Sequence, residues 1–362
     1  MQRVRSVAQH LGLSAPSVAQ QPSALSVPLT EVPPGVKVTP DITFLLDKTR
    51  GELADLYQPQ TRRSGEAPGA AIVFIHGGGW TGGDKDQPRS INVCSHLTLH
   101  GYTCLNINYL LASPKPGDYT KAAWPQNYHD CQRGVQWLRQ NAEQLHIDPT
   151  RIGVIGGSAG GHLAHMVALA PPELAAADPR AAGLLDTTQF PVDGVRCAVN
   201  LYGPADFLIG IEDVDKPGAS LTMFPGPLAA YQELYRQASP TTHIHAGNPP
   251  VFLLHGTADT TVDIRQSELY VAKAQACGAR VRFRKVVGAP HAFHLEPLDG
   301  RGDSDLCVIQ TRALCFLLVC ISVLRSGCES TIRAWLNLTG MCGCSKPEVL
   351  DFLEQYLLRP AA

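Results

Sequence analysis

Residues 151–165 read RIGVIGGSAGGHLAH, so four glycines and one alanine surround Ser158. The residues just before this cluster, 152–155, are apolar or small, as in a buried strand. After the cluster, apolar residues between positions 163 and 170 recur at the spacing of an amphipathic helix. The pattern therefore predicts that Ser158 lies on a sharp turn between a strand and a helix.

Residues 156–160 have the form G-x-S-x-G, which is typical of a nucleophile elbow. In such an elbow the backbone at the serine is strained, and the turn lifts the hydroxyl clear of the sheet. The neighbours two positions away must be tiny, because larger side chains would collide where strand and helix nearly touch. A glycine-rich turn that binds a phosphate is the alternative, and this stretch alone does not decide between the two.

The composition is that of an ordinary globular protein. The chain has 362 residues, 44% of them hydrophobic, and a formal net charge of −2 at pH 7. It therefore lacks the basic surface expected of a nucleic-acid-binding protein. Residues 1–30 contain Arg3 and Arg5, no acidic residue and no clear apolar core of a secretory signal. We expect a disordered leader there, with a weak export signal or a transit peptide as alternatives, and slightly favour a cytoplasmic location over secretion.

The eleven cysteines are unevenly distributed along the chain. Six of them crowd between Cys307 and Cys344, with no spacing typical of a zinc site, so no metal site is predicted. The other five are thinly spread, and we expect them to be buried free thiols rather than a disulfide framework: Cys94, Cys104, Cys131, Cys197 and Cys277.

Residues 307–345 differ from the rest of the chain. Their apolar core, 313–324, is too short to span a bilayer, so no membrane span is predicted. Without them, Leu306 would run directly into KPEVLDFLEQYLL (346–358), which has the pattern of an amphipathic helix. Our hypothesis is that 307–345 is a retained intron or another gene-model or cloning error. A genuine inserted lid or dimerisation hairpin is the alternative.

Strands and helices alternate along most of the chain. A β-hairpin is predicted after Gly35, and helices are predicted over 130–145 and 263–277. Strands are predicted at 69–80, 102–111, 152–155, 196–203, 249–256 and 280–288. This order favours a single α/β domain over residues 31–362, with a mostly parallel sheet covered by helices on both faces. Residues 203–245 are rich in proline and glycine and are expected to form a lid-like excursion.

The strand 69–80 ends in HGGGW, residues 76–80. Three consecutive glycines leave bare backbone N–H groups, which suit a developing oxyanion. Ligands of such sheets bind beyond the carboxyl ends of the strands, which is where this loop is predicted to lie. A flexible turn is the alternative. His76 is expected to anchor the loop rather than to move protons.

Two later strand ends supply an acid and a base. Asp259 follows the strand 249–256, and His291 follows the strand that ends at Gly288. The order Ser158, Asp259, His291 is the chain order of nucleophile, acid and base in this architecture.

Each partner has an alternative. Asp263 could be the acid, but it falls at the start of the next helix. His294 could be the base, and His162, one helical turn after Ser158, is expected to be a packed helix residue instead. Asp130, near the start of a predicted helix, is expected to cap that helix or to support the site.

Taken together, HGGGW, GGSAGG, YGPADF, HGTAD and GAPHAFH resemble the α/β-hydrolase superfamily. The most similar branch is the feruloyl-esterase-like and hormone-sensitive-lipase-like carboxylesterases of bacteria. The resemblance covers about residues 38–294 and resumes at 346–357, and it implies hydrolysis of carboxylic esters with no metal or organic cofactor. It also implies small acyl or alcohol groups, such as acetyl or feruloyl esters of plant polysaccharides. One departure is Leu110, which stands where the family usually has an arginine after NINY.

The expected mechanism is acyl transfer to water through an acyl-serine, with Ser158 as nucleophile, His291 as base and Asp259 as the orienting acid. The oxyanion would bind the N–H groups of Gly78, Gly79 and Ala159. Candidate walls of the substrate pocket are aromatic, and each could equally be plain core: Trp80, Tyr109, Trp124, Tyr202 and Phe224.

Two other functions remain as alternatives. A formamidase or peptidase would cleave an amide with the same triad, and a hydrolase-fold binding protein would have lost a triad member. The expected partner is a small-molecule or polysaccharide-linked ester, and the sequence leaves the oligomeric state open.

Overall fold

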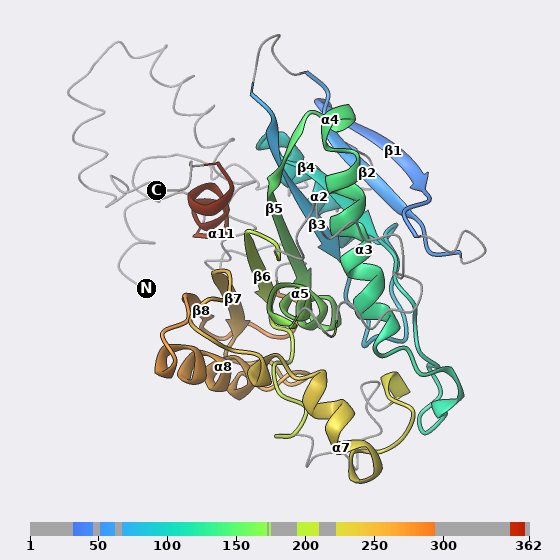
Figure 1. Ribbon diagram of the computed structural model, residues 1–362, viewed down its shortest axis with the longest axis vertical. Coiled ribbons are helices and arrows are strands. Elements are labelled where there is room, and N and C mark those ends of the chain that lie inside the picture. The colour runs from blue at the N-terminus through green and yellow to red at the C-terminus, as the bar shows by residue number, and fades with distance from the viewer. Residues whose placement is uncertain are drawn as a thin grey trace, which may run out of the picture.

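The computed structural model describes residues 32–45, 51–61, 67–171, 174, 194–209, 222–293 and 348–358 (Figure 1). The expected leader, His294 and residues 307–345 lie outside the described residues. The described part folds around one sheet with helices on both of its faces (Figure 1).

The sheet has eight strands in the order β1-β2-β4-β3-β5-β6-β7-β8. The strands β1 and β2 form the predicted antiparallel hairpin, β2 also pairs antiparallel with β4, and the pairs from β4 to β8 are parallel. Their bounds are β1 Val36–Ile42, β2 Ala54–Pro59, β3 Gly69–Ile75, β4 Thr103–Ile107, β5 Ile147–Gly157, β6 Cys197–Leu201, β7 Val251–Gly256 and β8 Val281–Val286.

The helices fill the connections between the strands. Their bounds are α2 Pro88–Leu99, α3 Gln126–Gln140, α4 Ala142–Leu145, α5 Ala159–Leu169, α7 Leu228–Gln237, α8 Arg265–Ala276 and α11 Glu348–Leu353. Short 3-10 turns form at Tyr119–Lys121 and Pro240–Thr242, and a π-helical turn, Glu354–Leu358, follows α11.

Alternate residues of the central strands point to opposite faces, and both faces are buried. Val73, Val154 and Leu253 belong to a core shared with α3, α5 and α8. On the other face, Ile72 and Phe252 belong to a core shared with α2 and α11. The α/β-hydrolase prediction from the sequence is confirmed in this arrangement, which gathers the carboxyl ends of the parallel strands at one edge.

The helices differ from the sequence prediction in three places. The helix expected over 130–145 begins at Gln126, because Asn127 and Tyr128 are also buried, and it is interrupted at Asn141 before α4. Sequence reasoning did not identify α2, which separates β3 from β4. The excursion at 203–245, read as irregular, contains α7.

The C-terminal helix packs onto the sheet as its amphipathic pattern predicts. In α11 and the turn after it, one apolar face is buried: Val349, Leu350, Phe352, Leu353 and Leu357. On its polar side Asp351 pairs with Arg282 of β8 at 3.1 Å. Residues 348–358 therefore complete the core on this face of the sheet.

Candidate active site

Ser158 occupies a strained turn between β5 and α5. Its φ and ψ angles are +56° and −121°, a conformation that L-residues rarely adopt. The backbone N–H of Ser158 donates to the Leu201 carbonyl, and the Ser158 carbonyl accepts the N–H of His162, the first bonds of the turn and of the helix. These bonds fix the conformation, and the serine side chain lies at the carboxyl edge of the sheet, partly exposed.

The glycines around Ser158 are required by close backbone approaches. A Cβ atom at Gly156 would collide with the carbonyl oxygen of Gly160, and one at Gly160 would collide with the carbonyl oxygen of Ile75 at the end of β3. A Cβ at Gly77 would lie 2.8 Å from the Gly157 carbonyl oxygen and 3.3 Å from Ser158 Cβ. The missing side chains thus bring the glycine loop and the serine turn into contact.

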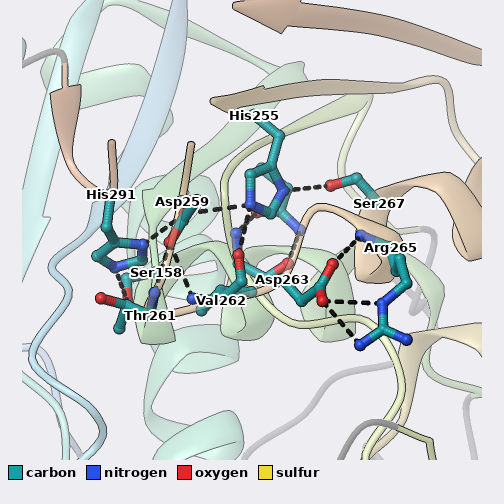
Figure 2. A network of polar contacts seen from close by, with 11 residues as sticks. Ser158, His255, Asp259, Thr261, Val262, Asp263, Arg265, Ser267 and His291 are labelled. Atoms are coloured by element: carbon teal, nitrogen blue, oxygen red, sulfur yellow. Dashed lines mark hydrogen bonds and ion pairs between the residues drawn. The ribbon is translucent and has the colours of Figure 1, made fainter. Parts of the chain in front are cut away.

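A chain of hydrogen bonds joins three of the predicted residues (Figure 2). His291 Nε2 lies 3.0 Å from Ser158 Oγ, and His291 Nδ1 lies 2.7 Å from Asp259 Oδ2. Because a carboxylate only accepts, the hydrogen of His291 lies on Nδ1, and Nε2 can accept the hydroxyl hydrogen of Ser158. The arrangement has the geometry of a nucleophile, a base and an orienting acid.

The Asp259 carboxylate is fully enclosed and fully bonded. Its side chain is 0% exposed, and Oδ1 accepts the backbone N–H groups of Thr261 and Val262, both at 2.9 Å. Oδ2 faces His291 and, at 3.1 Å, His255 Nε2. Burial alone would raise the pKa of Asp259, but these hydrogen bonds outweigh it and hold that pKa well below its ordinary value. The group is therefore an anion at any pH near neutrality.

The structure separates Asp259 from its alternatives. Asp263 turns away from the triad and pairs with Arg265 at 2.8 Å (Figure 2). His162 is buried in α5, where Nε2 lies 2.8 Å from the Ala238 carbonyl oxygen and Nδ1 accepts the indole N–H of Trp80. Burial lowers the pKa of His162 to about 4, against a smaller opposing effect of the Ala238 carbonyl. His162 is thus a packed helix residue, and His294 lies outside the described residues.

The glycine loop follows β3 directly. His76 Nδ1 lies 2.8 Å from the Gly77 carbonyl, and the Tyr109 hydroxyl donates to the His76 carbonyl. The Gly78 backbone has a φ of +132°, which favours glycine. Within the described part of the chain, the N–H groups of Gly78, Gly79 and Ala159 have no acceptor. They belong to the two segments that meet at Ser158, the glycine loop and the start of α5.

The candidate pocket walls are all at most 5% exposed. Tyr202 packs its ring against His291 with centroids 4.7 Å apart. Trp80 and Trp124 contact His162, and Tyr109 stacks on His76. The fifth, Phe224, stacks on Tyr235 of α7 and belongs to the core.

Asp130 lies inside α3 rather than at its end, so the capping interpretation is wrong. The helix begins four residues earlier than expected, at Gln126, and the amide of Gln126 donates to Asp130 Oδ1. Asp130 Oδ2 accepts the backbone N–H of Leu110 at 2.9 Å. The segment around Leu110 is therefore tied to α3 through its backbone.

Sequence reasoning missed His255 and Ser267. His255 is buried near the end of β7, and its Nδ1 lies 2.8 Å from Ser267 Oγ in α8. The signal was present in HGTAD, where a histidine interrupts an otherwise apolar strand four residues before Asp259. A polar residue in a buried strand needs a partner, and this one has three.

All five widely spaced cysteines are free, as expected, and four of them are buried. The exception to the expected burial is Cys277, which is exposed at the end of α8. Among the described residues, no cluster of histidine, cysteine, aspartate and glutamate could hold a metal ion. None of the helices in the described ranges is long and apolar enough to cross a membrane.

Comparisons with known proteins agree with this geometry. The family model BD-FAE matches residues 54–274. Two proteins of Mycobacterium tuberculosis are similar in sequence. The probable carboxylic ester hydrolase LipM is 31% identical over 66% of this chain and 52% of its own length. The esterase LipQ is 30% identical over 68% of this chain and 55% of its own length. The chain spans about half the length of these curated relatives.

A solved structure supports the fold. The butyrate-bound esterase Est2 of Thermogutta terrifontis aligns with a TM-score of 0.56 and 25% identity, over 80% of this chain and 95% of the esterase. Because the matched residues 54–274 make up more than half of the chain, the chain belongs to the BD-FAE family, within the α/β-hydrolase fold.

Proposed function

We propose that this protein is a serine carboxylesterase that hydrolyses esters of small acyl groups through an acyl-serine intermediate. The observation that carries the proposal is the unbroken hydrogen-bond chain from Ser158 through His291 to Asp259. The three free N–H groups beside Ser158 and the esterase names of the relatives support it.

Each step follows from the geometry. Ser158 Oγ attacks the ester carbonyl while His291 Nε2 takes its proton, and Asp259 stabilises the imidazolium that forms. The carbonyl oxygen becomes an oxyanion that accepts hydrogen bonds from Gly78, Gly79 and Ala159. His291 then gives the proton to the departing alcohol, and the same residues activate a water that releases the acid from the serine.

A small acyl group is favoured by two observations. Large aromatic rings pack against the two histidines nearest to Ser158 in the fold or the sequence: Tyr202 against His291, and Trp80 against His162, one helical turn after the serine. The Thermogutta esterase was solved with butyrate bound. We therefore propose acetyl to butyryl esters as preferred substrates, with feruloyl esters as the bulkier class to compare.

The decisive experiment replaces the nucleophile. Ser158→Ala should lower kcat by about four orders of magnitude or more with the fold intact, because the methyl group of alanine cannot form the acyl intermediate. The wild-type protein should hydrolyse p-nitrophenyl acetate and butyrate, and a phosphonylating reagent should label only the Ser158 peptide. Activity above a tenth of wild type in the variant would reject the proposal, and cleavage of N-formylkynurenine in preference to esters would favour an amide hydrolase.

The acid is tested by a matched pair of variants. Asp259→Asn should reduce kcat about 10⁴-fold, because an amide N–H facing His291 Nδ1 forces the imidazole hydrogen onto Nε2. Asp263→Asn makes the same chemical change in a carboxylate that pairs with Arg265 instead, and should stay within about threefold of wild type. A larger loss in Asp263→Asn than in Asp259→Asn would reassign the acid.

A further inference from the structure

His255 is a buried histidine that the mechanism above does not use. Its side chain is 0% exposed, and it lies at the end of β7 on the far side of Asp259 from His291 (Figure 2). Nε2 lies 3.1 Å from Asp259 Oδ2 and 2.9 Å from the Val262 carbonyl oxygen. Both oxygens can only accept, so Nε2 carries a hydrogen, which it shares between them. Nδ1 lies 2.8 Å from Ser267 Oγ, which holds the other edge of the ring.

The Asp259 carboxylate uses all of its hydrogen-bonding capacity. Its two oxygens offer about four lone-pair sites, and four donors occupy them: two backbone N–H groups on Oδ1 and two imidazoles on Oδ2. The side chain has no exposure to solvent, so water cannot replace a donor that is removed. Each donor therefore affects both the orientation of the carboxylate and the negative charge it offers to His291.

We propose that His255 is a positioning residue for catalysis: its Nε2–H, held in place by Ser267, fixes the Asp259 carboxylate against His291. The inference rests on the proposed esterase function. The two imidazoles share one carboxylate oxygen, so the donor on the His255 side sets how strongly Asp259 attracts the imidazolium of His291.

The direction of the effect follows from the charges around Asp259. His255 faces it from β7, His291 from the loop after β8, and the Tyr202 hydroxyl lies near it from the end of β6. Asp263 also interacts electrostatically with His255, and Arg265 of α8 pairs with this second carboxylate. Removal of the His255 donor leaves more negative charge for His291, which then stays protonated to a higher pH. Because the base must be neutral, the acid limb of the kcat/KM profile should move to higher pH.

Three variants separate positioning from structure. His255→Phe keeps a buried ring but removes the donor, His255→Gln keeps a side-chain N–H, and Ser267→Ala removes only the hydroxyl that holds the ring. His165→Phe is the matched control, because this buried histidine of α5 stacks on Tyr270 and bonds Asn200 but is not bonded to Asp259. All four are measured as full-length protein for kcat, KM, the pH profile and thermal stability.

We expect kcat to fall about 10- to 100-fold in His255→Phe, with KM within about twofold and the acid limb about 0.5 to 1 pH unit higher. His255→Gln should have a kcat within about fivefold of wild type and an acid limb at the wild-type pH. Ser267→Ala should move the acid limb to higher pH, as His255→Phe does, but by less. His165→Phe should lower stability but leave the limb in place.

A folded His255→Phe whose acid limb coincides with that of wild type would overturn the proposal. If His255→Phe does not fold, an unchanged limb in Ser267→Ala overturns it instead. These outcomes are distinct from failure of the proposed function, which would appear as a wild-type protein without esterase activity or a Ser158→Ala variant that keeps it.

Discussion

Two regions at the carboxyl edge of the sheet achieve their geometry by opposite means. Around Ser158, positions are fixed by missing side chains: Gly77, Gly156 and Gly160 let backbone approach backbone more closely than any Cβ allows. Around Asp259, positions are fixed by added hydrogen bonds from His255, His291 and two backbone N–H groups. The serine side is built by steric exclusion, and the acid–base side is built by polar contacts.

The two kinds of construction respond differently to change. A backbone approach fails when any atom is added, because no alternative position is available to a colliding Cβ. A hydrogen-bond network loses strength one donor at a time, and a similar donor can restore part of it. The serine side should therefore be all-or-none, whereas the acid–base side should be adjustable.

Among the changes that leave the three triad residues in place, the largest effect is expected from a single added methyl group in the glycine loop. A Cβ at Gly78 would collide with the Gly82 carbonyl oxygen, so Gly78→Ala must displace the N–H groups of the loop. We expect kcat to fall about 10²- to 10³-fold with little change in KM, measured on p-nitrophenyl butyrate, because these donors act mainly in the transition state.

Gly101→Ala is the matched control for backbone strain. Gly101 also has a positive φ, +90°, but a Cβ there meets nothing within 4 Å. This variant should lose about 1 kcal/mol of stability and keep wild-type kcat. If Gly78→Ala raises KM alone, the loop binds substrate rather than the oxyanion.

The comparison also explains what the sequence could reveal. The elements of the serine side are contiguous, since HGGGW and GGSAGG each contain their own requirements, and the strands that carry them are unbroken apolar runs. His255 and Ser267 support Asp259 from a strand and a helix twelve residues apart, and their pairing depends on the way α8 packs on β7. The helix start at Gln126 and the helix α2 were missed because polar residues lie on their buried faces, where an amphipathic pattern places apolar ones.

Acid should destabilise the folded protein through its buried histidines, two of which lie on the serine side. Burial lowers the pKa of both His76 and His162 to about 4, against an ordinary value of about 6.5. Between these two pH values the histidines bind protons in the unfolded chain but not in the folded chain. Their contribution to the free energy of unfolding is therefore complete above about pH 6.5 and decreases as the pH falls toward 4. Asp259 has a lowered carboxyl pKa, so its contribution is present above its ordinary value near 4 and is lost only below it.

We therefore expect the free energy of unfolding to decrease between pH 6.5 and 4.5 by up to about 1.4 kcal/mol per pH unit for each such histidine. Urea unfolding at several pH values measures this slope. His162→Gln should be less stable at pH 7 but should show a shallower slope. A free energy that stays constant down to pH 4.5 would show that these histidines are not held neutral by the fold.

The smallest effect is expected from the largest change, the removal of residues 307–345. We propose that this segment is foreign to the fold, because the residues before it complete the catalytic triad and the residues after it complete the core of the sheet. His291 is in place against Asp259, and α11 buries its apolar face in the core of the sheet. The shortened chain should be more soluble and should keep kcat and KM within about twofold, since the hydrogen bonds of the triad and the packing of α11 are made by residues outside the segment.

The control for this deletion is a truncation that also removes α11. Loss of residues 307–362 takes away five buried apolar side chains and the Arg282–Asp351 ion pair. At about 1.5 to 3 kcal/mol for each buried side chain, that loss is comparable to the whole stability of a typical domain, so the truncated chain should not fold. Circular dichroism and soluble yield distinguish the two chains. If the 307–345 deletion behaves like the truncation, the segment belongs to the enzyme and the acid–base side depends on residues beyond its hydrogen bonds.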